Sequence, residues 1–437
     1  MLKTLMNAFK IKELRNKILF TFAMLVVIRL GSQLPVPGVD RTYFANWFAA
    51  QSGDAFSFFD AFTGGSFLNM SIFALNITPY ITSSIIMQLM TIAIPKLEEM
   101  QKDGEEGRKK IASITRYVTV GLALVESAAM AIGFGRSGLL QEYNALNVIT
   151  VIVALTAGSA VLMWIGERIT ENGVGNGISI ILVINIISRL PQDLVGLYEQ
   201  FIKGKAVAVG VCSAIIILAV IIAMVILVII LNDGTRKIPV QYAKKVQGRK
   251  FVGGQQSSIP LKVNTAGVIP IIFASSILEF PLVICSLFGI QGTGFWAEIM
   301  KGMNSSYWCK ISAPQYSIGL VVYILLVIFF AYFYTSITFN PMEVSENMKK
   351  QGGFIPGIRP GKPTNEYLTK ILNYIIFIGA CGLTIIGILP FIFNGLFNAS
   401  VSFGGTSLII IVSVILETIK QIESMMLVRN YKGFLND

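Results

Sequence analysis

The chain has 437 residues, of which 54% are hydrophobic and 14% are charged, with a mean hydropathy of +0.69 and a formal net charge of +11. This composition excludes an ordinary soluble globular protein and indicates a membrane protein. The absence of histidine excludes histidine acid–base catalysis, serine–histidine triads and histidine metal sites. The four widely spaced cysteines form no C-x-x-C pair, so we interpret them as small buried side chains and expect no cofactor.

Ten apolar runs follow one another along the chain, and each is long enough to cover a hydrocarbon core of about 30 Å. They lie at residues 18–34, 72–94, 113–134, 147–165, 177–190, 207–231, 265–288, 316–339, 370–392 and 405–424. The first run has the basic start of a signal peptide, but Arg29 interrupts it and no clear cleavage site follows. We therefore interpret it as a retained helix and predict an all-α polytopic membrane protein.

The distribution of lysine and arginine predicts the orientation of these runs. If the N-terminus is cytoplasmic, most of the 35 basic residues fall in cytoplasmic segments. The external loops then hold only Arg41, Arg136, Arg189, Lys203, Lys205, Lys301 and Lys310. Because cytoplasmic loops carry the excess of positive charge, we expect both termini to be cytoplasmic and the protein to lie in the cell membrane.

Two stretches near the N-terminus do not fit a simple spanning helix. Residues 56–70, FSFFDAFTGGSFLNM, are too short and too rich in glycine to cross. They predict either a half-inserted helix, which needs protein or water around it, or an aromatic helix at the membrane interface. Residues 72–90 carry a proline and several hydroxyl and amide side chains, so this run either packs among other helices or lines a wet path.

Ten spans with both ends inside divide into five and five, so the second half begins on the opposite side of the membrane from the first. Such inverted halves are typical of proteins that open a path between two parts. We expect an N-terminal half at 1–190 and a C-terminal half at 191–437. Two long basic loops, 232–264 and 340–370, suggest rigid turns that present charge to a partner, either anionic lipid or nucleic acid such as ribosomal RNA.

Three carboxylates fall within or beside apolar runs, at Glu126, Glu279 and Glu417. Intramembrane acids are candidates for proton or ion coupling, so a secondary transporter with broken helices is the alternative hypothesis. The long basic loops argue against a transporter, which has no need of them. The chain also has no phosphate-binding G-x-x-x-x-G-K-[ST] motif, and we expect no enzyme activity.

Seven stretches, in chain order, resemble the SecY/Sec61-alpha family, the channel-forming subunits of the Sec protein translocase. They are RLGSQLPVPGVD at 29–40, SIFALNITPYITSSIIMQL at 71–89, GEEGRKKIASITR at 104–116, GVGNGISII at 173–181, PLKVNTAGVIPIIFASSILEFP at 260–281, GFIPGIRPG at 353–361 and FGGTS at 403–407. Two positions depart from the family pattern: Asn76 stands where a glycine is expected, and Glu417 where an aspartate is expected.

The resemblance implies a passive protein-conducting channel shaped like an hourglass, with a short plug helix at about 58–69. It implies that secretory polypeptides cross the membrane through the waist, while apolar segments leave sideways into lipid. The pore ring would comprise Ile81, Ile85, Ile178, Leu182, Ile272 and Ile410. The plug would include Phe58, Phe59, Phe62, Gly64, Gly65, Phe67, Leu68 and Asn69. The lateral gate would include Thr82, Ser83, Gln88, Ser275 and Ser276.

The resemblance also implies the partners. The expected small subunits are SecE and SecG, the drivers are the SecA ATPase or the ribosome, and the substrates are polypeptides that carry signal sequences. The two basic loops would dock the drivers, through Arg359, Arg249, Lys250, Lys244, Lys245 and Arg236. Arg359 is singled out because flanking prolines and glycines hold it in a defined turn.

Overall fold

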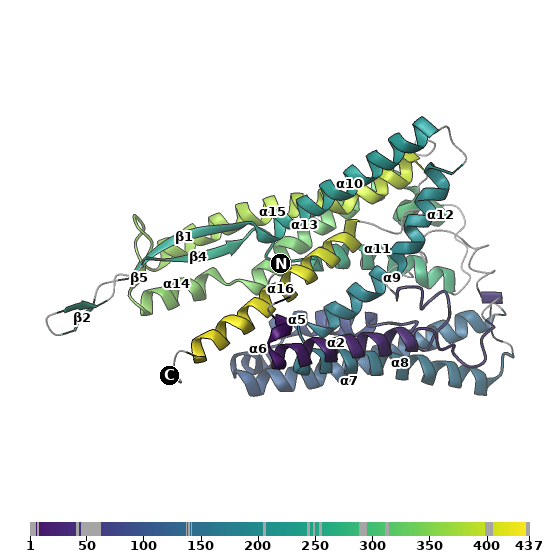
Figure 1. The fold of residues 1–437 in the computed structure, drawn as a ribbon, viewed down its shortest axis with the longest axis horizontal. Helices are drawn as coiled ribbons and strands as arrows, with labels where there is room; N and C mark the ends of the chain where they lie inside the picture. Colours follow the sequence, from purple (N-terminus) through teal and green to yellow (C-terminus); the bar gives the residue numbers. More distant parts are fainter. Residues whose placement is uncertain are drawn as a thin grey trace.

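The computed structural model describes residues 6, 8–40, 43–44, 63–136, 138, 140, 142–203, 207–242, 245–247, 250–252, 256–287, 295–310, 314–397 and 405–433. Ten helices coincide with the ten apolar runs, which confirms the predicted fold class (Figure 1). They are α2 (Lys12–Gly31), α5 (Thr78–Ala93), α7 (Glu105–Arg136), α8 (Ala145–Asn172), α9 (Gly177–Phe201), α10 (Val207–Asp233), α11 (Ile269–Leu287), α13 (Ile318–Thr338), α15 (Lys362–Phe397) and α16 (Gly405–Gly433).

Not all ten helices have the length and composition of a membrane span on their own. Within the described residues, six helical stretches pass that test: α7, α8, α9, the part of α10 from residue 210, residues 314–350 around α13, and α15 up to residue 389. Helix α5 and the following α6 (Pro95–Lys102) form a seventh candidate, bent by 106° at the break between them. Pro95 lies in the first turn of α6, where a missing N–H costs little. Ile94, the residue before it, is extended, with φ of −113° and ψ of 110°, so α5 ends there and the chain turns.

Helix α5 begins later than the apolar run that predicts it. Residues 71–77 form turns, and Asn76 has a left-handed φ of 53°. Pro79 lies in the first turn of α5, where its missing N–H would have no partner within the helix. The first part of the run, at 72–77, is therefore a connection, and the helical part, which carries Pro79 and most of the hydroxyl side chains, starts at Thr78.

Helix α9 begins with a specific cap and ends later than expected. The side chain of Asn176 accepts hydrogen bonds from the backbone N–H groups of Ile178 and Ser179, at 3.1 and 3.4 Å. The helix then continues through Pro191 to Phe201. The expected boundary between halves, after residue 190, therefore falls inside α9, and the connection between α9 and α10 follows residue 201.

The two sets of five helices pack in the same order. In the first set, α2 contacts α8 and α9, while α5, α7, α8 and α9 contact one another in succession. In the second set, α10 contacts α15 and α16, while α11, α13, α15 and α16 contact one another in succession. The sets meet where α9 contacts α10 and α16, and where α7 contacts α11. This repeated packing is what two related halves of an inverted fold require.

A small sheet lies beside α14 and α15 at one end of the molecule, and α12 (Phe295–Met303) lies at the opposite end (Figure 1). The strands β1 (Thr235–Tyr242), β4 (Gln256–Lys262) and β5 (Gly353–Phe354) are antiparallel in the order β4-β1-β5. A separate pair, β2 (Lys245–Gln247) and β3 (Lys250–Val252), forms the tip of the same loop. Helix α14 (Pro341–Lys350) precedes β5, and the short 3-10 turns η1 (Ser305–Tyr307) and η2 (Pro314–Ser317) precede α13.

The sheet is attached to the helices by its own hydrophobic cluster. Ile238 and Val240 alternate along β1 with exposed residues, as expected for a strand with one covered face. They pack with Leu261 of β4, Met348 of α14 and Leu368 of α15, all of which are buried. The described strands of the expected basic loops therefore pack on the helices through a hydrophobic cluster.

Candidate functional site

Five of the six expected ring residues belong to, or pack against, one hydrophobic cluster that is largely aliphatic. Leu182 and Ile410 are buried members, with 8% and 1% of their surfaces exposed. Ile81, Ile178 and Ile272 are half-buried and pack against the same cluster. Ile85, one helical turn beyond Ile81 on α5, is half-buried but does not belong to this cluster.

The elements that supply these residues come from both halves of the chain. Helices α5 and α9 belong to the first set and α11 and α16 to the second. The cluster therefore joins residues more than 300 positions apart, from Ile81 to Ile410. Branched aliphatic side chains offer no hydrogen bond to an ion or to water, so a ring of them at a narrow passage would resist wetting.

The described part of the expected plug is a series of turns that contacts α9 through Gly64, while its Phe67 belongs to a separate hydrophobic cluster. Gly64 and Gly65 both have left-handed backbones, with φ of 65° and 83°, which glycine adopts without strain. Phe67 is buried between Phe44 and Phe134, whose ring centroids lie 6.0 and 6.2 Å from its own. Leu68 is half-buried and Asn69 is exposed. Phe58, Phe59 and Phe62 lie outside the described residues.

Two hydroxyl side chains of α5, those of Ser83 and Thr91, have hydrogen-bond partners inside the protein. The Ser83 hydroxyl is buried and forms hydrogen bonds with the Thr119 hydroxyl of α7 and with the Tyr80 carbonyl. The Thr91 hydroxyl donates to the Gln88 carbonyl at 2.7 Å. Residues 72–90 were expected either to pack among other helices or to line a wet path. Ser83 packs among other helices.

The other expected gate residues lie on two helices from different halves. Thr82 is half-buried and Gln88 exposed on α5, whereas Ser275 is buried and Ser276 exposed on α11. Helix α11 contacts α7, which in turn packs on α5. These contacts place α5 and α7 of one half opposite α11 of the other.

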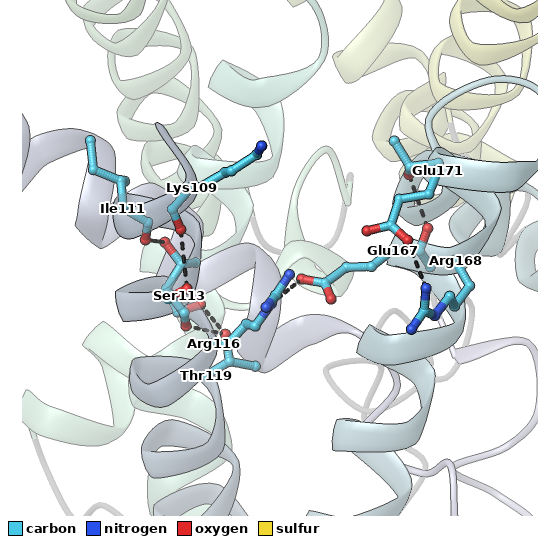
Figure 2. A network of polar contacts seen from close by, with 12 residues as sticks. Lys109, Ile111, Ser113, Arg116, Thr119, Glu167, Arg168 and Glu171 are labelled. Atoms are coloured by element: carbon cyan, nitrogen blue, oxygen red, sulfur yellow. Dashed lines mark hydrogen bonds and ion pairs between the residues drawn. The ribbon is translucent and has the colours of Figure 1, made fainter. Parts of the chain in front are cut away.

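A charged network, which the sequence analysis did not single out, joins α7 to α8 (Figure 2). Arg116 and Glu167 form an ion pair, with Nε and Oε1 separated by 2.7 Å. One residue further along α8, Arg168 pairs with Glu171 at 2.9 Å. Arg116 lies at the edge of one apolar run and Glu167 just past the next. Opposite charges at the ends of two neighbouring helices could have predicted this ion pair from the sequence.

The expected docking residues lie on the sheet and on the turn that follows it. Arg359 is exposed between β5 and α15, and its carbonyl accepts a hydrogen bond of 2.8 Å from the Thr364 hydroxyl. Gly357 and Gly361 on either side have φ of 83° and 102°. Arg236 is exposed on β1, while Lys245 and Lys250 lie on β2 and β3. Lys244 and Arg249 lie outside the described residues.

The remaining candidates bring no reactive site together. Among the described residues, no three histidine, cysteine or carboxylate side chains are placed to hold a metal ion. The cysteines at 212, 285, 309 and 381 are free. Glu126 is half-buried on α7, and Glu417 is exposed on α16. The side chain of Glu279 lies outside the described set.

Comparison with known proteins identifies the family. The fold defines a polytopic helical membrane protein in which two sets of five helices meet, with a hydrophobic cluster between them. The SecY family profile matches residues 71–419. The chain belongs to the SecY family, which confirms the resemblance stated above.

The relatives cover the whole chain. The chain is 44% identical to the protein translocase subunit SecY of Streptomyces galbus and 43% identical to that of Halalkalibacterium halodurans, with full coverage of both proteins. Among solved structures, a protein-conducting channel has a TM-score of 0.60 at 17% identity, covering 94% of this chain and 92% of its own. Sec61 in a canine ribosome–channel complex from the endoplasmic reticulum has the same TM-score, identity and coverage.

Proposed function

We propose that this chain is the channel-forming subunit of a protein translocase, through which secretory polypeptides cross the cytoplasmic membrane. The observation that carries the proposal is the hydrophobic cluster to which α5, α9, α11 and α16 from both halves contribute isoleucine and leucine side chains. Family membership supports the same function. A division into two halves of five helices each, expected at 1–190 and 191–437, is part of this proposal, with the boundary moved to the α9–α10 connection after residue 201.

The ring of Ile81, Ile85, Ile178, Leu182, Ile272 and Ile410 seals the resting channel. An ion in a narrow aliphatic waist loses its hydration shell and gains no ligand in return. The same side chains form no strong bond with a passing polypeptide, so substrates of different sequence can slide through. The plug, residues 58–69, covers the waist on the external side.

Helices α5, α7, α11 and α13 form the seam toward lipid. Thr82, Ser83, Gln88, Ser275 and Ser276 lie along that seam and separate when it opens. A central leucine contributes about −0.5 kcal/mol to insertion and a central charge about +3 kcal/mol, so the composition of a segment decides whether it leaves into lipid.

The channel itself is passive, and the partners supply the driving force. Arg359 and Arg236, with Lys244, Lys245, Arg249 and Lys250 on the loop tip, form a basic surface that docks the SecA ATPase or the ribosome. A solved ribosome–channel complex among the structural neighbours supports the ribosome as a partner. SecE and SecG subunits complete the complex, anionic lipid contacts the basic loops, and both termini are cytoplasmic.

The alternative hypothesis, a secondary transporter, needs polar ligands for a solute near the middle of the membrane. It would use Glu126 or Glu279 for coupling, whereas the cluster that joins the two halves consists of hydrophobic side chains and includes neither acid. The relatives of full length are protein translocase subunits. The channel is therefore the function that we propose.

The test uses proteoliposomes that contain the chain, a SecE-type partner, SecA and ATP. Protection of a secretory precursor from external protease is measured for the wild type and for Arg359→Glu. We expect protection in the wild type and its loss in Arg359→Glu, with activity retained in Lys349→Glu, which reverses an exposed charge on α14. Absence of protection in the assembled wild-type complex would refute the channel, whereas equal protection in Arg359→Glu would remove only the docking role.

A further inference from the structure

The turn at Gly64 is held by side chains from two transmembrane helices. The Gly64 carbonyl accepts a hydrogen bond from the Ser188 hydroxyl of α9 at 3.3 Å and a long one from Nη1 of Arg29 of α2 at 3.5 Å. The end of the turn is fixed by the backbone, because Val36 N–H donates to the Met70 carbonyl at 2.9 Å. The turn is therefore anchored at one end by main chain and at the other by side chains.

Gly64 fits this position because it has no side chain. A Cβ atom there would lie 2.6 Å from the Asn185 carbonyl oxygen and 2.8 Å from the Ser188 hydroxyl. Its φ of 65° is also a conformation that other residues avoid. The backbone of the turn thus lies directly on α9 at Asn185.

Asn185 contacts the start of α5 with its side chain. Its Nδ2 donates to Oδ1 of Asn76 at 3.0 Å, and both residues are buried, with 3% and 1% of their surfaces exposed. Asn76 precedes the expected gate helix by two residues. One turn of α9 therefore contacts both the plug segment through Gly64 and the gate helix through Asn76.

The hydrogen bond from the Ser188 hydroxyl to the Gly64 carbonyl can break at a low cost in free energy. The single hydroxyl proton is shared between the Gly64 carbonyl and the Asn185 carbonyl, which lies 2.6 Å away on the same helix. When Gly64 moves away, the hydroxyl keeps its bond to Asn185, so no donor is left buried without an acceptor. A contact of this kind holds a segment in place without preventing its release.

We propose that Ser188, Asn185, Asn76 and Arg29 form a polar latch that positions the plug turn and couples its release to movement of α5. This inference rests on the proposed channel function. In a channel of this kind, the latch sets how often the outer end opens in the absence of substrate. The four residues are positioning residues, since they act on the plug and gate and not on the substrate.

The test measures the exposure of the turn directly. Ser66 is 3% exposed in the turn. In a full-length chain whose four cysteines are replaced by alanine, Ser66→Cys is labelled with a maleimide in nanodiscs. Loss of one hydrogen bond is expected to raise the labelling rate by about two- to tenfold, through the population of the released turn. We expect this rise in Ser188→Ala and in Asn76→Gly, which removes the acceptor but tolerates the left-handed backbone.

Ser127→Ala is the matched control. The Ser127 hydroxyl also bonds a carbonyl three residues earlier, that of Leu124, and a hydroxyl on another helix, that of Thr156, but it lies on α7 and contacts no part of the turn. Ser127→Ala and the conservative Ser188→Thr should keep the wild-type rate. Unchanged labelling in both Ser188→Ala and Asn76→Gly would overturn the latch, and so would an equal rise in Ser127→Ala. Protease protection of a precursor, measured separately on the wild type, tests the channel function independently of the latch.

Discussion

Nε of Arg116 donates to a carboxylate oxygen of Glu167 at 2.7 Å, which joins α7 to α8 (Figure 2). The two side chains are 45% and 23% exposed, so water and salt weaken the attraction. The neighbouring pair of Arg168 and Glu171 lies within α8 alone. These two pairs allow a bond between helices to be compared with a bond within one helix.

We predict that Glu167→Gln lowers the free energy of unfolding by about 0.5–1 kcal/mol, and that Glu171→Gln lowers it by less than about 0.5 kcal/mol. The reason is that only Glu167 fixes the position of one helix against another. Thermal unfolding of the purified protein in detergent measures both effects. In about 1 M salt the difference should shrink, because screening weakens exposed pairs. A larger loss in Glu171→Gln would contradict the prediction.

A second prediction concerns the ring. Ile410→Ser places a hydroxyl in the waist, so wetting becomes easier and the ion conductance of the resting complex in planar bilayers should rise several-fold. Ile409→Ser is the matched control, since Ile409 is also 1% exposed but packs in a separate cluster with residues of α11 and α13. Both variants should lose about 2–5 kcal/mol of stability, as for other truncations of buried aliphatic side chains. Equal conductance in the two variants would argue against the ring.

A third prediction concerns the close contact at the start of α9. A Cβ atom on Gly177 would collide with the Gly166 carbonyl of α8, which is backbone and cannot rotate away. Gly177→Ala should therefore lower the free energy of unfolding by more than about 2 kcal/mol. On the same helix, a Cβ on Gly196 meets no atom within 4 Å, so Gly196→Ala should be neutral or stabilising by up to about 1 kcal/mol. Melting temperatures that fall equally would contradict this interpretation.

A fourth prediction concerns Cys309, between α12 and α13. Burial raises the pKa of the Cys309 thiol above its ordinary value. Because the thiolate is the reactive form, less of it is present at neutral pH, and its fraction increases as the pH rises through the raised pKa. In right-side-out vesicles, an impermeant maleimide should therefore label Cys309 slowly at pH 7 and much faster at pH 9.

The comparison for Cys309 is Gln315→Cys in a chain that lacks the native cysteines. Gln315 is exposed in the same loop, so its thiol should react faster at pH 7 and gain less between pH 7 and pH 9. Labelling of either position only after the membrane is opened would contradict the proposed orientation, in which this loop is external.

The sequence was sufficient to predict the helices but not all of their ends. Long apolar runs identify ten helices because the cost of burying backbone polar groups in lipid leaves few alternatives. The apolar run that predicts α9 ends at residue 190, just before Pro191. The helix nevertheless continues to Phe201, since hydropathy locates the membrane part of a helix and not its polar extension.

The strands in the basic loop were not predicted. In TRKIPVQY, apolar and polar residues alternate over only two buried positions, Ile238 and Val240. This short pattern lies in a region dominated by charge and did not indicate a strand. The residues of the candidate site could be predicted only in part from the sequence. The ring residues could be named from the family resemblance, but the pairing of Asn76 with Asn185 joins positions 109 apart, and nothing local in either segment indicates it.

The pairing of β1 with both β4 and β5 has a mechanical consequence. Gln241 lies between Gln256 of one loop and Phe354 of the other, so backbone hydrogen bonds join the two loops in one sheet. These bonds run across the strands, so a pull along β1 shears the seven residue pairs with β4 together and meets high resistance. Only residues 263–268 separate the end of β4 from α11. A displacement of either loop is therefore transmitted over a short connection to α11, which carries Ser275 and Ser276 of the proposed lateral gate.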